Sequence, residues 1–506
     1  MENIYFSFQE YFERLNKDPE RWGKVVSSLL GATKVLSHFE KAAIGGKDSM
    51  SGSFNELDVV PTLVSFACST TSTENIVTSH LKVSGNHLIV LKPRVREDGY
   101  PDLSSYEEVY RVVEAQIRSK NVVSSYVVEQ GGILAACFKM SFGSEKGFKV
   151  DSDLGLLQLV PGAIVVECNE LIDSEYAHLL GEVVDSGYEV NDLKFDHESV
   201  LNAWLAPYSE LYPMCVDESR EDLSIVDYVT DKLFKSKNLL DEVRVLIPVF
   251  PGTNCEYDMA RAFEAEGAVV EVLVFKNYEP EAIQSSLKEL ADGLSRCNIL
   301  ALAGGFSSGD EPDGSAKFIV NVLQNAGVKD AVASLLERDG LIVGICNGFQ
   351  ALLKSGLLVN GEVTTVSESS PTLFRNDINR HVSSMVSTRV STNNSPWLQG
   401  FDVGEVHQVA MSHGEGKFVA DKEILDELVA NGQVAFQYVN DEGMPTLNGH
   451  FNPNGSSLAI EGIVSKCGRI LGKMGHSERY VDGVFQNIDG NKLQNIFANG
   501  VSYFKK

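Results

Sequence analysis

The chain has 506 residues, a length that predicts two or three domains. Its composition, 43% hydrophobic and 22% charged, is ordinary for a globular protein. A formal net charge of −27 argues against a nucleic-acid-binding protein, which would carry a basic surface, and against binding to an anionic membrane. Solubility is the simplest explanation of this charge.

The 8 cysteines are scattered along the chain, and none forms a C-x-x-C pair. This usage indicates neither a zinc site nor a disulfide framework, and it fits a reducing cytosol. The N-terminus lacks the basic start and apolar core of a signal peptide, and no stretch reaches the ~20 apolar residues of a membrane span. We therefore expect a cytoplasmic protein that does not enter a membrane.

The first part of the chain predicts a domain that mixes helices and strands. Residues 8–40 predict one or two helices, because Tyr11, Phe12 and Leu15 recur at helical spacing. This pattern begins almost at residue 1, which suggests that the chain starts inside a domain. Strands are predicted at 59–67, 87–91 and 162–168, and helices at 106–119 and 129–140. The domain is expected to end near residue 192.

A glycine-rich stretch at residues 43–52, Ala-Ile-Gly-Gly-Lys-Asp-Ser-Met-Ser-Gly, predicts a tight loop. Gly46 would allow a phosphate to approach the backbone, and Lys47 and Ser49 would bind it. Asp48 would supply an oxygen ligand to Mg²⁺. The spacing differs from that of a Walker A motif, and an ordinary surface turn is the alternative interpretation.

Residues 193–241 mix charged residues with isolated apolar ones, and we interpret them as a packed linker because Trp204 and Tyr208 need a core. From residue 242 the pattern changes to alternating strands and helices. Strands are predicted at 243–250, 269–275, 298–303 and 341–345, and helices at 255–266, at 279–294 and through 330. This alternation predicts a doubly wound parallel sheet with functional residues at the carboxyl ends of its strands.

Cys346 lies between the apolar run Leu341–Ile345 and an amphipathic helical segment, with glycines two residues before and two residues after it. This G-x-C-x-G spacing is the cysteine counterpart of the G-x-S-x-G nucleophile elbow, in which a sharp turn from strand to helix presents the side chain to substrate. The sulfur would also lie at a helix N-terminus, where the dipole favours a thiolate. The alternative is a buried structural cysteine.

A nucleophilic thiol needs a base within hydrogen-bond reach, and the base needs a group that orients it. Residues 469–479 look like a strand leading into a polar loop that carries His476 and Glu478. In an extended chain these two side chains project from the same side. Cys346, His476 and Glu478 therefore form a predicted catalytic triad. The alternative is that Glu478 pairs with Arg479 in solution.

A set of short motifs is highly specific in combination. The motifs are Gly45–Gly52, Phe250–Glu256, Gly304–Asp310, Gly344–Gly348, Asn452–Gly455 and His476–Arg479. Through them the chain resembles phosphoribosylformylglycinamidine synthase, the glutamine-dependent enzyme of purine synthesis, in its large single-chain form. The resemblance covers nearly the whole chain, but only the C-terminal portion of that enzyme.

The resemblance implies an α/β fold with two domains. Residues 242–506 would form a doubly wound class I glutamine amidotransferase domain, after the linker at 193–241. Residues 1–192 would form a partial α+β domain that is similar to aminoimidazole ribonucleotide synthetase and has a truncated N-terminal layer. In that superfamily the loop at residues 46–49 borders a nucleotide site, which implies ATP or ADP and Mg²⁺ there.

The resemblance also implies roles around the triad. The backbone N–H groups of Gly305 and Asn347 would hold the oxyanion of the reaction intermediate, and Gln350 matches a position that contacts bound glutamine. Residues 413–416 resemble a loop near the same pocket. Cys255 lacks flanking glycines like those of the elbow, so we assign it a structural role near the pocket.

The resembled enzyme converts formylglycinamide ribonucleotide, ATP and glutamine to the amidine, and ammonia passes from its glutaminase to its synthetase. We expect a complete glutaminase and an incomplete synthetase, so that the chain needs a missing N-terminal synthetase segment or subunit. One alternative is a class I amidotransferase that serves another acceptor, against which the stretch at 43–52 argues. The other is a non-catalytic scaffold or regulatory homologue, against which the intact triad argues.

Overall fold

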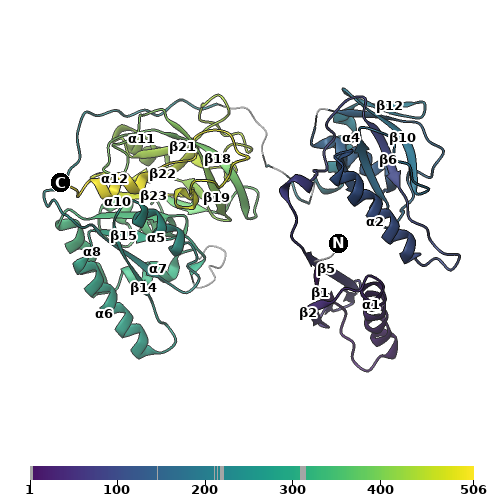
Figure 1. Ribbon diagram of the computed structural model, residues 1–506. Helices are drawn as coiled ribbons and strands as arrows, with labels where there is room; N and C mark the ends of the chain where they lie inside the picture. Colours follow the sequence, from purple (N-terminus) through teal and green to yellow (C-terminus); the bar gives the residue numbers. More distant parts are fainter. Residues whose placement is uncertain (1–3, 145, 210, 214, 217–221, 308–314) are drawn as a thin grey trace. The chain divides into compact units, whose positions relative to one another are not determined.

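The computed structural model describes residues 4–144, 146–209, 211–213, 215–216, 222–307 and 315–506 (Figure 1). The chain folds as two compact units, Met1–Glu210 (unit 1) and Leu211–Lys506 (unit 2). The boundary between them lies inside the segment 193–241 that the sequence analysis interpreted as a linker. Residues 308–310, at the end of the Gly304–Asp310 motif, lie outside the described residues.

Unit 1 begins with a small sheet in which β1 is the central strand, parallel to β2 and antiparallel to β5. Helix α1 starts after Asp18, whose side chain accepts a hydrogen bond from the Glu20 N–H at 2.9 Å. The elements are β1 (Tyr5–Tyr11), α1 (Pro19–His38), β2 (Ala43–Ser49), β3 (Ser53–Phe54), β4 (Leu57–Asp58) and β5 (Thr62–Cys68).

One prediction for this region is wrong in part, because only α1 within residues 8–40 is helical, and a second prediction is wrong. Residues 8–40 are not helical throughout, because the chain up to Tyr11 forms β1, where aromatic side chains favour a strand and both neighbours supply backbone partners. The stretch at 43–52 is not a tight loop, because most of it forms β2. Gly46 pairs with Phe8, and a Cβ on Gly46 would lie 2.5 Å from the Phe8 carbonyl oxygen. Glycine therefore serves close strand packing here.

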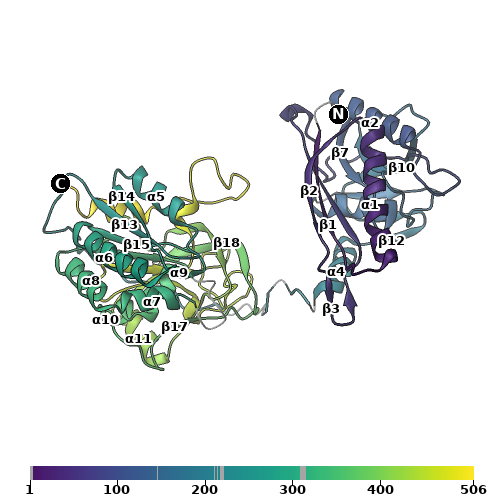
Figure 2. The same cartoon turned by 90° about the horizontal axis from the view of Figure 1, so that it is seen from below.

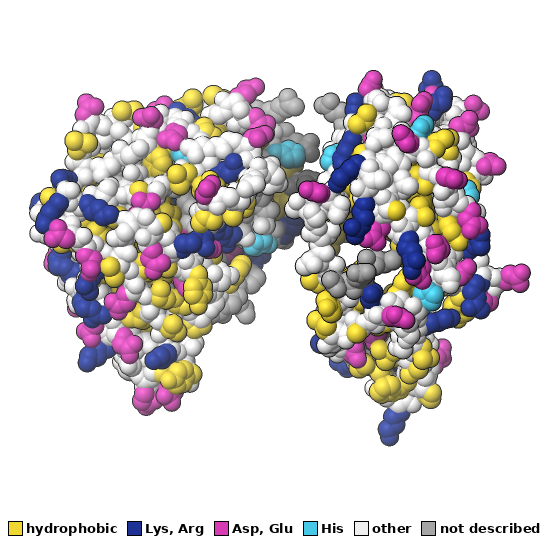
Figure 3. All heavy atoms as spheres, in the orientation of Figure 1, with side chains coloured by type: hydrophobic (Ala, Val, Ile, Leu, Met, Phe, Trp, Pro, Cys, Tyr) yellow, Lys and Arg dark blue, Asp and Glu magenta, His cyan; other side chains and the backbone are white. Residues whose placement is uncertain are grey.

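The small sheet leaves large apolar side chains in water. Ile44 on β2 is 77% exposed, and on β5 Phe66 is 56% and Leu63 41% exposed. Figure 3 shows hydrophobic side chains gathered over this part of unit 1. An extended apolar surface of this kind usually marks a site of interaction with another protein surface.

The rest of unit 1 is built on a sheet with the strand order β12-β11-β8-β10-β6-β9-β7. Alternate residues of β6 face opposite sides, so that Leu88 and Val90 share a core with α3 while Ile89 and Leu91 share one with α2. The elements are β6 (His87–Leu91), α2 (Leu103–Arg118), β7 (Val122–Val127), α3 (Gly132–Phe142), β8 (Gly147–Val150), β9 (Ile164–Cys168), β10 (Ala177–Val184), β11 (Tyr188–Val190), β12 (Leu193–Phe195) and α4 (His197–Ser209).

Unit 2 is built on one large sheet with the order β14-β13-β15-β16-β23-β22-β21-β18-β19. Its strands are β13 (Arg244–Val249), β14 (Val269–Val274), β15 (Ile299–Leu302), β16 (Leu341–Ile345), β18 (Val382–Val390), β19 (Val406–His413), β21 (Val434–Tyr438), β22 (Ile460–Val464) and β23 (Ile470–Lys473), and β17 (Thr372–Phe374) pairs separately with β20 (Lys417–Val419). Its helices are α5 (Glu256–Ala265), α6 (Pro280–Arg296), α7 (Lys317–Leu323), α8 (Ala326–Glu337), α9 (Asn347–Lys354), α10 (Leu357–Asn360), α11 (Lys422–Ala430) and α12 (Ile496–Ser502).

The predicted α/β fold is confirmed in unit 2. Strands β14, β13, β15, β16 and β23 run parallel, and the remaining strands extend the same sheet in antiparallel fashion, which the sequence analysis did not predict. Helices α6, α8 and α9 cover one face of the parallel strands and α5 covers the other (Figure 2). The helix predicted to run through residue 330 is two helices, α7 and α8, because the Asn325 side chain caps α8.

None of the helices in the described part of the chain combines the length and the apolar character that crossing a bilayer requires. Acidic and basic side chains are interspersed on the face drawn in Figure 3. The net negative charge of the chain therefore does not gather into one acidic patch on that face.

A fully buried ion pair supports the loop that follows β23. The Lys473 Nζ atom lies 3.2 Å from Glu461 Oε1 on the neighbouring strand, and neither side chain is exposed. Lys473 also donates to the Gly475 carbonyl at 2.7 Å and to Ser477 Oγ at 3.0 Å. The Gly475 N–H donates to Glu461 at 2.5 Å. The pair thus holds the residues on both sides of His476.

Replacing Lys473 by Met is expected to lower the free energy of unfolding by about 3–5 kcal/mol, because it leaves the Glu461 carboxylate buried without an opposite charge. The double variant Lys473→Met/Glu461→Gln should lose less than the sum of the two single changes. Urea denaturation measures the free energy of unfolding of the two single variants and the double variant. The exposed pair Lys466–Glu427 is the control, and Lys466→Met should cost under about 1 kcal/mol. If Lys473→Met lowered the free energy of unfolding as little as Lys466→Met does, the ion pair would not support the loop after β23 as proposed.

Candidate active site

Cys346 sits at a sharp turn between β16 and α9. Its backbone φ of 54° and ψ of −106° are unusual for a residue with a side chain, and it occupies the N-cap position of α9. A Cβ on Gly344 would lie 2.5 Å from the Gly348 carbonyl oxygen, and one on Gly348 would lie 2.0 Å from the Leu302 carbonyl oxygen. Both glycines of the G-x-C-x-G pattern are therefore required by close backbone contacts, as the elbow interpretation expects.

His476 follows β23 and pairs with Glu478. The His476 Nδ1 and Glu478 Oε1 atoms are 2.5 Å apart, and both side chains are almost fully buried. The His476 N–H donates to the Ala410 carbonyl on β19 at 2.7 Å, which fixes the backbone of the loop. Glu478 thus contacts His476, and the alternative in which Glu478 pairs with Arg479 in solution is wrong.

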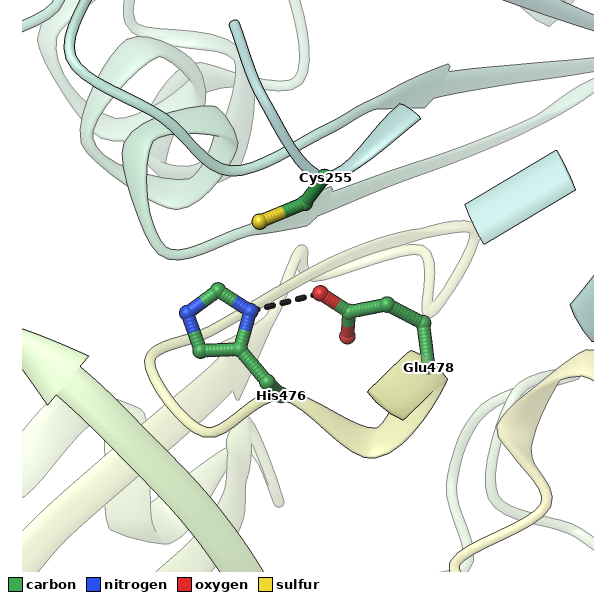
Figure 4. Close-up of side chains that lie close together, drawn as sticks. All are labelled: Cys255, His476 and Glu478. Atoms are coloured by element: carbon green, nitrogen blue, oxygen red, sulfur yellow. Dashed lines mark hydrogen bonds and ion pairs between the residues drawn. The ribbon is translucent and has the colours of Figure 1, made fainter. Parts of the chain in front are cut away.

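Parallel pairing of β16 with β23 brings the thiol and the imidazole to one place, at the carboxyl ends of the two strands. A Cβ on Gly304, at the end of the neighbouring β15, would lie 2.8 Å from His476 Cε1, 3.5 Å from Cys346 Cβ and 3.2 Å from Cys255 Sγ. These three side chains therefore converge on the space above Gly304. Figure 4 shows Cys255 pointing toward the imidazole ring, and Glu478 bonded to a ring nitrogen.

The electrostatic surroundings favour a protonated His476. Burial alone would lower the pKa of His476, but the Glu478 carboxylate and the thiols of Cys255 and Cys346 outweigh burial and raise that pKa well above its ordinary value. Burial opposes ionisation of Glu478 as well, but the charge of His476 holds the pKa of Glu478 below its usual range. The pair is therefore a carboxylate and an imidazolium near neutral pH.

A second buried histidine near the site cannot fill this role. The Nδ1 atom of His413, the last residue of β19, lies 3.2 Å from Asn376 Oδ1. Burial, with the nearby positive charge of His476, lowers the pKa of His413 to about 3. His413 therefore stays neutral in the pH range in which His476 carries a proton.

The predicted glutamine- and oxyanion-binding residues surround the elbow. Gly305 has a φ of 150°, and its neighbour Gly304 accepts hydrogen bonds from the backbone of the Phe250–Glu256 motif. The Asn347 side-chain amide donates to Gln350 Oε1 at 2.8 Å, and Gln350 Nε2 donates to the Glu415 carbonyl at 2.6 Å. In this structure Gln350 therefore ties α9 to the loop 413–416.

Two contacts of the site were not anticipated from the sequence. Cys255 occupies the N-cap position of α5, is only 3% exposed, and accepts a hydrogen bond from Arg479 Nη2 at 3.4 Å. Arg479 is half-buried next to the triad instead of pairing with a surface carboxylate. One feature of the sequence could have indicated these contacts. The Phe250–Glu256 motif follows β13, so it lies at the same edge of the sheet as Cys346.

The residues predicted to bind nucleotide and Mg²⁺ lie elsewhere, on β2 in unit 1. The Lys47 Nζ atom contacts Ser49 Oγ, because residues two apart in a strand share a face. Asp48 lies on the opposite face, so the four residues Gly46, Lys47, Asp48 and Ser49 do not converge on one ligand. This arrangement does not fit a shared phosphate and Mg²⁺ site, and we derive no chemical step through one.

Comparisons with known proteins agree with the site in unit 2. Residues 242–504 match the family model described as "CobB/CobQ-like glutamine amidotransferase domain". The chain is 34% identical over 257 residues to phosphoribosylformylglycinamidine synthase subunit PurQ of Rhodopseudomonas palustris strain HaA2, covering 51% of this chain and 96% of that protein. It is 33% identical over 251 residues to the PurQ subunit of Gloeobacter violaceus, covering 50% of this chain and 95% of that protein.

Among solved structures, that of PurLQS from Thermotoga maritima has a TM-score of 0.38 and 25% identity, covering 52% of this chain and 99% of that chain. This structural overlap is too low to carry an argument, whereas the family model spans half of the chain and the chain spans nearly all of its PurQ relatives. The chain therefore belongs to the CobB/CobQ-like glutamine amidotransferases, and within them to the glutamine amidotransferase portion of phosphoribosylformylglycinamidine synthase.

Proposed function

We propose that this chain hydrolyses glutamine at Cys346 and supplies the ammonia for the ATP-dependent conversion of formylglycinamide ribonucleotide to formylglycinamidine ribonucleotide in purine biosynthesis. The observation that carries the proposal is the convergence of Cys346 and His476 above Gly304, with Glu478 bonded to the far side of the imidazole. A thiol, a base and an orienting carboxylate are the groups that amide hydrolysis through a covalent intermediate needs.

In the first half of the reaction, the Cys346 proton resides on His476, and the thiolate attacks the side-chain amide carbon of glutamine. The tetrahedral intermediate collapses as the His476 imidazolium gives its proton to the departing nitrogen, which leaves as ammonia. A thioester remains on Cys346. The N-terminal end of α9 favours the thiolate from which this step starts.

In the second half, neutral His476 removes a proton from a water molecule that attacks the thioester. Collapse of the second tetrahedral intermediate releases glutamate and returns the sulfur and the imidazolium to their starting states. We propose that the backbone N–H groups of Gly305 and Asn347 donate hydrogen bonds to the oxyanion in both intermediates. Each such donor contributes on the order of 10²–10³ in rate in enzymes of this type.

Glu478 should determine the alkaline limit of activity. Its carboxylate raises the pKa of His476, so the imidazolium persists at low pH and is lost as the pH rises through that raised pKa. Glu478→Gln removes this effect, so the alkaline limb of the kcat/KM profile should move to lower pH and kcat should fall roughly 10²–10⁴-fold. Glu405→Gln, which alters the pair with His407 instead, is the control. If the alkaline limb of the kcat/KM profile lay at the same pH in Glu478→Gln and Glu405→Gln, Glu478 would not have the proposed role.

Cys346 should be the sole nucleophile among the thiols. Cys346→Ala is expected to lower kcat for glutamine hydrolysis by roughly 10⁴–10⁶-fold without unfolding the chain, whereas Cys255→Ala should retain hydrolysis. An electrophilic glutamine analogue should label Cys346 alone, as read by peptide mapping. Full hydrolysis by Cys346→Ala, or label on another cysteine, would refute the assignment.

We further propose that the synthetase reaction requires a partner synthetase segment or subunit, which covers the apolar surface of the small sheet in unit 1. The support is the exposure of Ile44, Leu63 and Phe66 on that sheet and the failure of residues 46–49 to converge on one ligand. The PurQ relatives are named as a subunit of the synthase, which agrees with a divided enzyme.

This requirement predicts that the purified chain, given ammonia, ATP, Mg²⁺ and formylglycinamide ribonucleotide, forms no amidine product while it still hydrolyses glutamine. Product formation from ammonia bypasses the glutaminase, so the assay isolates the synthetase step. Robust amidine formation by the chain alone would overturn the need for a partner and leave the glutaminase assignment intact.

A further inference from the structure

The end of β19 and the loop 413–416 that follows it lie against the elbow. The Cys346 sulfur lies 3.7 Å from the Ser412 carbonyl oxygen, and the Gln350 amide nitrogen donates to the Glu415 carbonyl at 2.6 Å. Gln350 is the position that the sequence analysis assigned to glutamine binding. The placement of these two carbonyls therefore helps to define the space that the side chain of glutamine would occupy.

The connection between β17 and β18 carries a buried asparagine that holds this loop. Asn376 is only 2% exposed, and its backbone N–H donates to the Gly414 carbonyl at 2.9 Å. Its amide nitrogen donates to the carbonyls of Arg380 at 3.1 Å and of His413 at 2.8 Å. Its amide oxygen accepts from the Gly416 N–H at 3.2 Å and lies 3.2 Å from Nδ1 of His413. Both N–H groups and both lone pairs of this amide are therefore used.

These contacts determine which ring nitrogen of His413 carries the proton. The Asn376 amide nitrogen faces two carbonyls, so the amide oxygen faces His413 and Nδ1 must be the donor. Because burial, with the positive charge of His476, lowers the pKa of His413 to about 3, the ring stays neutral and keeps this tautomer near neutral pH. The hold of Asn376 on the loop therefore does not change in the pH range in which His476 carries a proton.

A second buried asparagine holds the same loop from its other end. Asn454, in the Asn452–Gly455 motif, is fully buried and donates to the Gly416 carbonyl at 3.0 Å and to the Tyr438 hydroxyl at 2.9 Å. Its oxygen accepts from the Ser456 N–H at 3.1 Å and from Ser456 Oγ at 2.9 Å. Gly416 is thus bonded through its N–H to Asn376 and through its carbonyl to Asn454.

We propose that Asn376 and Asn454 are positioning residues for glutamine binding, which fix the residues on both sides of Glu415 and so present its carbonyl to Gln350. Gln350 is then held at both ends of its amide, because its oxygen accepts from the Asn347 side chain at 2.8 Å. A side chain that is already ordered loses less conformational entropy when a ligand binds. The inference rests on the proposed function, because glutamine is the ligand.

Other contacts hold the nucleophile and the base. The close backbone contacts of Gly344 and Gly348 position Cys346, and the Lys473 amine holds the residues on both sides of His476. Loss of Asn376 should therefore weaken the binding of glutamine and leave the chemical step nearly intact. A general loss of folding would instead lower the activity without changing the KM.

Steady-state kinetics of glutamine hydrolysis by the full chain tests this difference. Asn376→Ser should raise the KM for glutamine about 10–100-fold and change kcat by less than about threefold. The control is Asn393→Ser, which breaks two hydrogen bonds to Thr230 beyond the end of β18 that lies away from His413, and both constants should stay unchanged. A parent KM in Asn376→Ser, or a fall in kcat alone, would overturn the proposal.

A double variant tests whether Asn376 acts through Gln350. Gln350→Ala alone should raise the KM, and adding Asn376→Ser should raise it little further, because the contact with the Glu415 carbonyl is already lost. If the two effects on KM multiplied, Asn376 would not act through Gln350 and the proposal would be wrong.

A binding measurement separates this inference from the glutaminase itself. Calorimetry on Cys346→Ala gives the Kd of glutamine without turnover. Binding about 10–100-fold weaker in Cys346→Ala/Asn376→Ser than in Cys346→Ala would support the positioning role. That result with a parent chain that fails to hydrolyse glutamine would refute the glutaminase alone. Equal binding in the two variants would refute the positioning role alone.

Discussion

The arrangement of the active site depends on the parallel pairing of β16 with β23. Gly344 lies opposite Gly472, so the two strands end at the same level and the residues that follow them, Cys346 and His476, meet. A Cβ on Gly472 would lie 2.2 Å from Cδ2 of Phe349, so this glycine lets α9 pack directly on β23. The helix that carries the nucleophile is thereby seated on the strand that leads to the base.

The register of β16 and β23 does not by itself orient the loop that follows β23. The buried pair of Lys473 and Glu461 orients that loop. A buried ion pair is a poor source of net stability, because removing two charges from water costs about as much as their attraction returns. Here its hydrogen bonds go to the backbone of Gly475 and the hydroxyl of Ser477. The charged groups therefore determine the direction of His476 between those residues, which an apolar pair of the same volume could not do.

The sequence allowed prediction of the features that depend on local patterns. The turn at Cys346 follows from glycines whose Cβ atoms would strike backbone, and the contact of His476 with Glu478 follows from two residues close in the chain. Strand β1 was missed because its partner β5 is distant in sequence, and the pairing of β18 with β21 was missed for the same reason. The contact of Arg479 with Cys255 was not predicted for a related reason, since Cys255 follows a different strand.

The space above Gly304 brings together the groups that the proposed hydrolysis needs. A glutaminase of this kind needs an ionisable sulfur and an imidazole nitrogen free of other hydrogen bonds, held together where water is scarce, and the buried Nε2 of His476 meets that requirement. Arg479, whose guanidinium donates to the sulfur of Cys255, adds a positive charge that stabilises a nearby thiolate. A positive side chain at this point therefore favours the ionised form of the nucleophile.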